Sequence, residues 1–213
     1  IAVATTKAYS TQMAVLNLLG LYFGEVMGTV DYETYTAMIR DILDLPEKLE
    51  QVLAQADRIR EMAKNFAGRD DVFFIGRNLD YALSLEGSLK LKEISYIHSE
   101  AYASGELKHG TISLIEEGTL VAAVSTQPEL YAKTISNMVE VKARGAYVIL
   151  LSKDKDITDK SICDVHISLP QAPDEFVIFE SVIICQLIAY YTSTGKGLNP
   201  DQPRNLAKSV TVE

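Results

Sequence analysis

Residues 72–96 read VFFIGRNLDYALSLEGSLKLKEISY, and this stretch decides the fold of the chain. It begins with an apolar run at 72–75 and enters a helical pattern at 81–96. The same alternation follows, with apolar runs at 120–124, 146–151 and 165–169 and helical patterns at 128–143 and 174–191. Strands that are apolar throughout and alternate with helices are typical of a parallel sheet covered on both faces. The sequence therefore predicts an α/β fold, a three-layer αβα sandwich with a parallel sheet and right-handed crossovers.

Folds of this kind bind ligands beyond the carboxyl ends of their strands. Gly76-Arg77-Asn78 and Ser125-Thr126 occupy two of those ends. No GxGxxG motif follows the first strand and no Walker motif occurs in the chain. The sequence therefore gives no reason to expect a nucleotide cofactor.

The helix at 81–96 carries charges where a purely structural helix would place Leu or Ala. At about 100° per residue, Glu86, Lys90 and Glu93 project between two apolar strips, and we expect the opposite side to face water. The strips comprise Ala82, Leu85, Leu89 and Tyr96, and Leu83 with Ile94; the side expected to be solvated comprises Ser84, Ser88, Lys92 and Ser95. Ionisable groups at core-facing positions are usually paired or functional, which favours a proton-transfer site. The alternative is an ordinary i, i+4 ion pair on a solvated surface.

The first 66 residues predict three further helices. Residues 7–26 are apolar on most sides, and Gly28 is suited to end that helix. Two amphipathic helices are expected at 31–45 and 46–66, with Pro46 in the first turn of the second. We interpret them as a solvated connector.

Composition excludes several classes of function. A formal charge of −9 over 213 residues argues against nucleic acid or an anionic membrane as the main partner. Cys163 and Cys185 have no metal-site spacing, so neither zinc nor a disulfide framework is expected. The apolar run at 176–191 is too short and too polar to span a bilayer, which predicts a buried helix. We expect a cytoplasmic protein and, since the chain starts at Ile1 without methionine, a part of a longer one.

Four segments, at 1–9, 85–98, 105–110 and 201–213, together resemble the glucosamine-6-phosphate synthases, the glutamine:fructose-6-phosphate amidotransferases. That resemblance implies a glutaminase followed by two sugar-isomerase (SIS) domains. It places the end of the first SIS domain at 1–29, connecting helices at 30–66, the second SIS domain at 67–197 and an active-site tail at 198–213. The glutaminase and most of the first SIS domain would then lie outside this chain.

The resemblance also implies the roles of particular residues. Glu93 corresponds to the carboxylate that moves a proton between C1 and C2 of the sugar, and Lys90 to the lysine that assists it. His109 corresponds to a histidine that opens the sugar ring in the neighbouring subunit of a homodimer. Lys208 corresponds to a tail lysine that contacts the sugar and has a Schiff-base role. Val3, Thr5 and Ala207 correspond to positions that contact fructose 6-phosphate, and no cofactor or metal is implied.

Other interpretations stay open from the residues alone. A sugar-phosphate sensing module, a unit that only dimerises, and a deaminase or deglycase of amino-sugar phosphates are all compatible with an SIS fold. Glu86 is expected either to react or to position Lys90, and Arg204 to anchor the tail through a carboxylate. We interpret His98 and His166 as structural.

Overall fold

The computed structural model describes residues 3–154 and 157–207 and contains one parallel sheet. Its five strands lie in the order β2-β1-β3-β4-β5. Their bounds are Asp71–Gly76 (β1), His98–Ala103 (β2), Leu120–Ser125 (β3), Tyr147–Ser152 (β4) and Val165–Ser168 (β5). Every neighbouring pair is parallel, with Val72 opposite Leu120 and Leu120 opposite Tyr147. The predicted fold class, a three-layer αβα sandwich, is confirmed.

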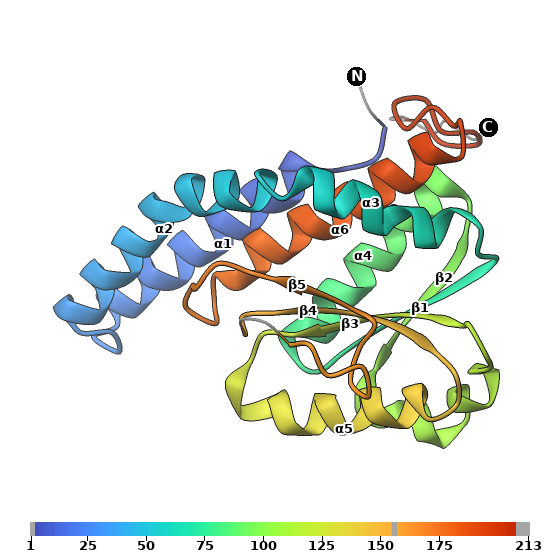
Figure 1. Cartoon of the computed structure of the whole chain (residues 1–213). Helices are drawn as coiled ribbons and strands as arrows, with labels where there is room; N and C mark the ends of the chain where they lie inside the picture. Colours follow the sequence, from blue (N-terminus) through green and yellow to red (C-terminus); the bar gives the residue numbers. More distant parts are fainter. Residues whose placement is uncertain (1–2, 155–156, 208–213) are drawn as a thin grey trace, which may run out of the picture.

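Helices cover both faces of the sheet (Figure 1). One face carries α3 (Ala56–Ala67), α4 (Leu79–Ser95) and α6 (Val177–Gly195). The other carries α5 (Tyr131–Lys142) with the 3₁₀ turns η1 (Ser104–His109) and η2 (Thr111–Leu114), while η3 (Pro128–Leu130) leads into α5. The long helices α1 (Lys7–Val26) and α2 (Tyr32–Leu53) extend beyond the edge of the sheet, and α2 packs on α6.

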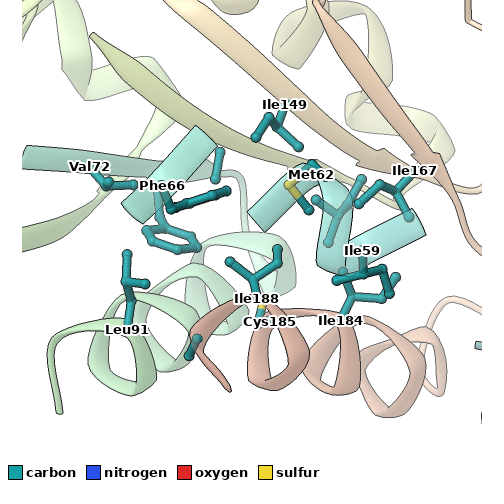
Figure 2. Packing of buried hydrophobic residues seen from close by; sticks show 14 of the residues in the cluster. Ile59, Met62, Phe66, Val72, Leu91, Ile149, Ile167, Ile184, Cys185 and Ile188 are labelled. Carbon is teal, nitrogen blue, oxygen red and sulfur yellow. The ribbon is translucent and has the colours of Figure 1, made fainter. Parts of the chain in front are cut away.

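Two apolar clusters fill the layers on either side of the sheet. Figure 2 shows the first, in which Phe66 of α3, Leu91 of α4 and Ile184 of α6 meet Val72 and Ile149 of the strands. The second cluster joins the strands to α5 and η1. Helix α6 is long and apolar enough to cross a membrane, but 67% of its most apolar window is buried within the structure. It is the central helix of the first cluster, as the sequence predicts.

The prediction that a helix starts at Pro46 is wrong, because α2 continues through Pro46 to Leu53. A proline inside a helix removes one backbone hydrogen bond and costs about 3 kcal/mol. Burial of Leu45 and Val52, on either side of the proline, offsets that cost. The chain breaks instead at Ala54 and Gln55, before α3.

The side of α4 expected to face water does so at Lys92, but the prediction is wrong for its three serines. Ser84, Ser88 and Ser95 are buried, whereas Leu85 and Leu89 are 49% and 42% exposed. A helical wheel gives the periodicity of side chains but does not say which side meets the protein. The buried hydroxyls are satisfied by carbonyl groups: Ser84 Oγ donates to Asp80 O (2.7 Å) and Ser95 Oγ to Leu91 O (2.6 Å) within the helix, and Ser88 Oγ donates to Ser99 O of β2 (2.9 Å).

Strand β2 is not among the strands that the sequence predicts. Its sequence, HSEAYA, has no continuous apolar run, and most of its residues are only partly buried. A strand at the edge of the sheet has only one neighbouring strand, so it needs less apolar surface than β1 or β3. Its position beside β1 brings His98 next to Asp71 at the amino ends of the strands.

Candidate active site

Glu86, Lys90 and Glu93 form a compact charged cluster on α4. The Lys90 Nζ lies 2.6 Å from Glu93 Oε2 and 3.6 Å from Glu86 Oε1. Lys90 is only 3% exposed, and the glutamate side chains are 13% and 21% exposed for Glu86 and Glu93. Burial raises the pKa of Glu86, which the neighbouring ammonium of Lys90 opposes. The prediction of paired, core-facing charges on this helix is confirmed.

The packing of α4 fixes the direction in which this cluster points. A Cβ at Gly87 would lie 3.0 Å from both Phe74 and Cys185, so the helix approaches β1 and α6 as closely as a glycine permits. At its carboxyl end, Ser193 Oγ of α6 donates to the Ile94 carbonyl at 2.7 Å. The helix therefore has little freedom to rotate and expose its serines.

Glu93 forms part of the wall of an open pocket of about 550 Å³. Tyr96 and His98 extend that wall beyond the end of α4, and residues 204–206 of the tail close the other side. Pockets of about 300–1,000 Å³ are the usual size for small-molecule ligands. The Glu93 carboxylate, which buried Lys90 holds from behind, and the tail thus border a space that a small molecule can enter.

The tail is attached to Tyr96. The Arg204 backbone N–H donates to the Tyr96 hydroxyl at 2.7 Å, and the Arg204 guanidinium carbon lies 4.1 Å from the centre of the Tyr96 ring. Among the described residues, the contact of the Arg204 guanidinium is thus an aromatic ring, and its predicted contact with a carboxylate stays a prediction. An aromatic face attracts the guanidinium because the ring carries partial negative charge above its plane.

The other predicted site residues are distributed around the chain. Ala207 is exposed and directly follows the tail residues that line the pocket, while Lys208 lies outside the described residues. Val3 and exposed Thr5 flank Ala4, which packs against the cluster containing α6. None of these four positions is among the described residues that line the pocket.

His109 lies on the opposite face of the sheet from Glu93. It is the exposed last residue of η1, whose Leu107 is buried beside Met138 and Val141 of α5. Glu93 belongs to the layer of α3, α4 and α6. The described part of one chain therefore does not bring His109 and Glu93 together.

The two histidines interpreted as structural have different surroundings. His166 is buried and its Nε2 lies 3.0 Å from Ser152 Oγ, as expected of a core histidine. His98 is exposed, lies 2.6 Å from Asp71 through Nδ1, and contributes to the pocket wall. Tyr96 is the site residue that the sequence did not reveal, because it was assigned to an apolar strip.

The carboxyl ends of β1 and β3 are held by side-chain hydrogen bonds. Buried Asp80 accepts from the Thr126 backbone N–H at 2.9 Å and from its hydroxyl at 2.5 Å. Gln127 accepts from Asn78 Nδ2 and donates to the Arg77 carbonyl, each at 3.1 Å. The pocket beside Ser125 and Thr126 is only about 180 Å³. The larger pocket, at the end of α4, is therefore the better candidate.

No group of three or more His, Cys, Asp or Glu side chains within residues 3–154 and 157–207 is arranged to hold a metal ion.

The chain resembles known proteins along its whole length. It is 51% identical to the glutamine–fructose-6-phosphate aminotransferase (isomerizing) of Symbiobacterium thermophilum, with all of this chain and 35% of the relative covered. It is 49% identical to the enzyme of the same name from Clostridium acetobutylicum, with the same coverage. The chain thus spans about a third of the length of the curated relatives it matches.

A solved structure gives the same result. The C-terminal domain of the glucosamine–fructose-6-phosphate aminotransferase of Francisella tularensis superposes with a TM-score of 0.89 at 34% identity. The superposition covers 95% of this chain and 57% of that one. The resemblance inferred from the sequence motifs is confirmed. The SIS domain family matches residues 65–194, more than half of the chain, and the chain therefore belongs to that family.

Proposed function

We propose that this chain is the isomerase half of an enzyme that makes glucosamine 6-phosphate from fructose 6-phosphate and ammonia. The observation that carries the proposal is the pairing of Lys90 with Glu93 at the wall of a pocket shared with the tail. The names of the relatives support the substrate and the reaction. Because the chain spans about a third of those relatives, a glutaminase and the rest of a first SIS domain would come from outside it. Such an enzyme would act in the cytoplasm.

Glu93 is proposed to carry the isomerisation. In the imine of fructose 6-phosphate and ammonia, a base removes a proton from C1 and the resulting enolamine receives a proton at C2. A single carboxylate near both carbons can perform both transfers. Lys90 lies 2.6 Å from that carboxylate and is proposed to hold it in place, while Glu86 holds Lys90 from the other side.

His109 is proposed to open the sugar ring in the neighbouring subunit of a homodimer. Within one chain the sheet separates η1 from α4, yet His109 is exposed and available to a second molecule. Histidine suits ring opening because its unperturbed pKa lies near neutrality. The separation of these two residues supports a shared site.

The ends of the chain are proposed to complete the substrate site. Val3 and Thr5 would contact the sugar from residues 1–29, the end of the first SIS domain, and Ala207 and Lys208 from the tail at 198–213. The helix α1 supports that division, because Leu16, Tyr22 and Phe23 are more than half exposed and would be covered by the rest of a first SIS domain. Residues 30–66 would connect this part to the second SIS domain at 67–197.

The substitution Glu93→Gln tests the proposal in the full-length enzyme. Loss of the base should lower glucosamine 6-phosphate formation at least about 100-fold, while glutamine hydrolysis stays measurable. The control is Glu61→Gln, which removes an exposed carboxylate of α3 that pairs with Lys64. An enzyme that loses both activities equally in Glu93→Gln would contradict the assignment.

Mixing that variant with His109→Ala extends the same experiment to the dimer. Each homodimer would lack one of the two groups in every site, whereas a heterodimer would contain one site with both. We expect isomerase activity to return when the two variants are mixed and exchange subunits to form heterodimers. Heterodimers that form and stay inactive would refute the shared site.

A further inference from the structure

Tyr96 has an unusual backbone conformation. In the described part of the chain, three non-glycine residues have positive φ, and two of them are the asparagines Asn78 and Asn205. Asparagine adopts the left-handed region readily, whereas residues with a bulky side chain do so rarely. Tyr96, with φ of 61° and ψ of 18°, ends α4 in this conformation.

The tail uses both parts of the Tyr96 side chain. The hydroxyl accepts the Arg204 backbone N–H, and the ring lies under the guanidinium of the same residue. These two contacts hold the main chain and the side chain of Arg204 at once. Buried Pro203 precedes the contact, and Asn205 turns the chain directly after it.

Both contacts lie next to the proposed catalytic group. Tyr96 is three residues beyond Glu93, and both belong to the wall of the same pocket. Residues 204–206 form the facing wall, and Ala207 and Lys208 follow in the sequence. The position of the tail is therefore set by the helix that carries the carboxylate.

We propose that Tyr96 is a positioning residue that holds the C-terminal tail in register over the Glu93 pocket before substrate binds. This inference rests on the proposed function, because it assigns the tail to the substrate site. The anchor acts through Arg204 on the position of the tail and takes no part in the proton transfer.

The anchor determines the affinity for the sugar phosphate rather than the rate of proton transfer. When the tail is released, only a fraction of molecules present the complete pocket, and the apparent affinity falls by that fraction. Once substrate has closed the tail, Glu93 and the sugar meet in the same arrangement. Loss of the anchor therefore raises KM for fructose 6-phosphate and changes kcat little.

Limited digestion of the full-length protein with trypsin tests the anchor independently of catalysis. Tyr96→Asn keeps a residue suited to positive φ and removes both contacts, while Tyr96→Phe removes only the hydroxyl. We expect cleavage after Arg204 to accelerate about tenfold in Tyr96→Asn and about two- to threefold in Tyr96→Phe. The control is Arg60→Gln, which removes the other described guanidinium that lies over a tyrosine ring, 4.9 Å from the centre of Tyr191.

Cleavage after Arg204 at the wild-type rate in Tyr96→Asn, with an unchanged melting temperature, would overturn the anchor. The kinetic measurement then tests its role, with KM for fructose 6-phosphate expected to rise about tenfold in Tyr96→Asn and kcat to stay within about twofold. Accelerated cleavage with an unchanged KM would overturn the positioning role. A wild-type protein without isomerase activity would instead refute the proposed function, while the digestion would still decide whether Tyr96 holds the tail.

Discussion

Two carboxyl groups on the same side of the sheet, the partly buried Glu93 on α4 and the fully buried Glu180 on α6, have opposite surroundings. Glu93 is paired with Lys90 and reaches a pocket. Glu180 is fully buried, and in the part of the chain that the structure describes neither of its oxygens has a hydrogen-bond partner. Burial raises the pKa of Glu180 to about 7, although the charges of Lys48 and Lys153 oppose that rise.

This contrast shows that a perturbed acid is not by itself an active site. If an active-site acid were chosen only because its pKa is raised close to 7, Glu180 would be chosen. A proton-transfer group must also lie within hydrogen-bonding distance of its substrate, and the side chain of Glu180 is fully buried. The paired and accessible carboxylate is the better candidate.

Removing the positive charge of Lys90 from the α4 cluster should have the largest effect on the free energy of unfolding. Lys90→Met would leave Glu86 and Glu93 close together and partly buried without a positive charge. Breaking a buried pair in this way costs about 3–5 kcal/mol of unfolding free energy. Urea unfolding at pH 8 would measure it.

Lys92→Met is the matched control, because Lys92 is exposed on the same helix two residues later. Its effect should stay within about 0.5 kcal/mol. Equal losses for the two lysines would mean that the cluster is solvated, and the contrast with Glu180 would disappear.

Glu180→Gln should have the next largest effect on the free energy of unfolding, and this variant should be more stable than wild type. The folded pKa of about 7 lies above the ordinary value of 4.5, so the folded state holds the Glu180 proton more tightly. Stability from this group is therefore complete below about pH 4.5 and is lost as the pH rises through 7. Glutamine stays neutral, so the variant should gain about 3 kcal/mol at pH 8 and about 1 kcal/mol or less at pH 5.

Unfolding curves between pH 5 and pH 8 would test this difference between wild type and Glu180→Gln. Glu86→Gln is a useful comparison, since burial raises the pKa of Glu86 but Lys90 counteracts it. Its pH-dependent gain should be smaller. Identical pH profiles for wild-type protein and Glu180→Gln would show that the Glu180 carboxyl finds a partner in solution.

Much of the fold could be predicted, because apolar runs such as Val121 to Val124 have few other structures available to them. The edge strand β2 could not, since its first three residues, His98, Ser99 and Glu100, are polar and give it no apolar pattern along its whole length. The sequence around Pro46 predicts a helix start for a related reason. The cost of the proline is local, whereas the burial of Leu45 and Val52 that offsets it depends on the distant α6.

The candidate site also has a part that the sequence predicts and a part that it does not. The spacing of Glu86, Lys90 and Glu93 places them together on any helix, so their pairing was predictable. The contact between Tyr96 and Arg204 joins residues 108 positions apart through a left-handed backbone conformation, and no local pattern of the sequence indicates it. The buried serines of α4 were assigned to water because hydroxyls are counted as polar, although their partners are carbonyls inside the protein.

Ser88 is a buried polar group that is neutral and has hydrogen-bond partners. It therefore provides the test with the smallest expected effect in the comparison of α4 with Glu180. Its hydroxyl donates to the Ser99 carbonyl at 2.9 Å, and the Ser99 hydroxyl donates back to the Ser88 carbonyl at 2.8 Å. Ser88→Ala should lower the unfolding free energy by about 1 kcal/mol at every pH, because the loss is a hydrogen bond and not a charge. Leu85→Gln on the exposed strip should change it by less than about 0.5 kcal/mol. A Ser88→Ala variant that is more stable than wild type, as Glu180→Gln is expected to be, would contradict this comparison. Having hydrogen-bond partners would then not separate the buried polar groups of α4 from Glu180 of α6, and the case for Glu93 would rest on the pocket alone.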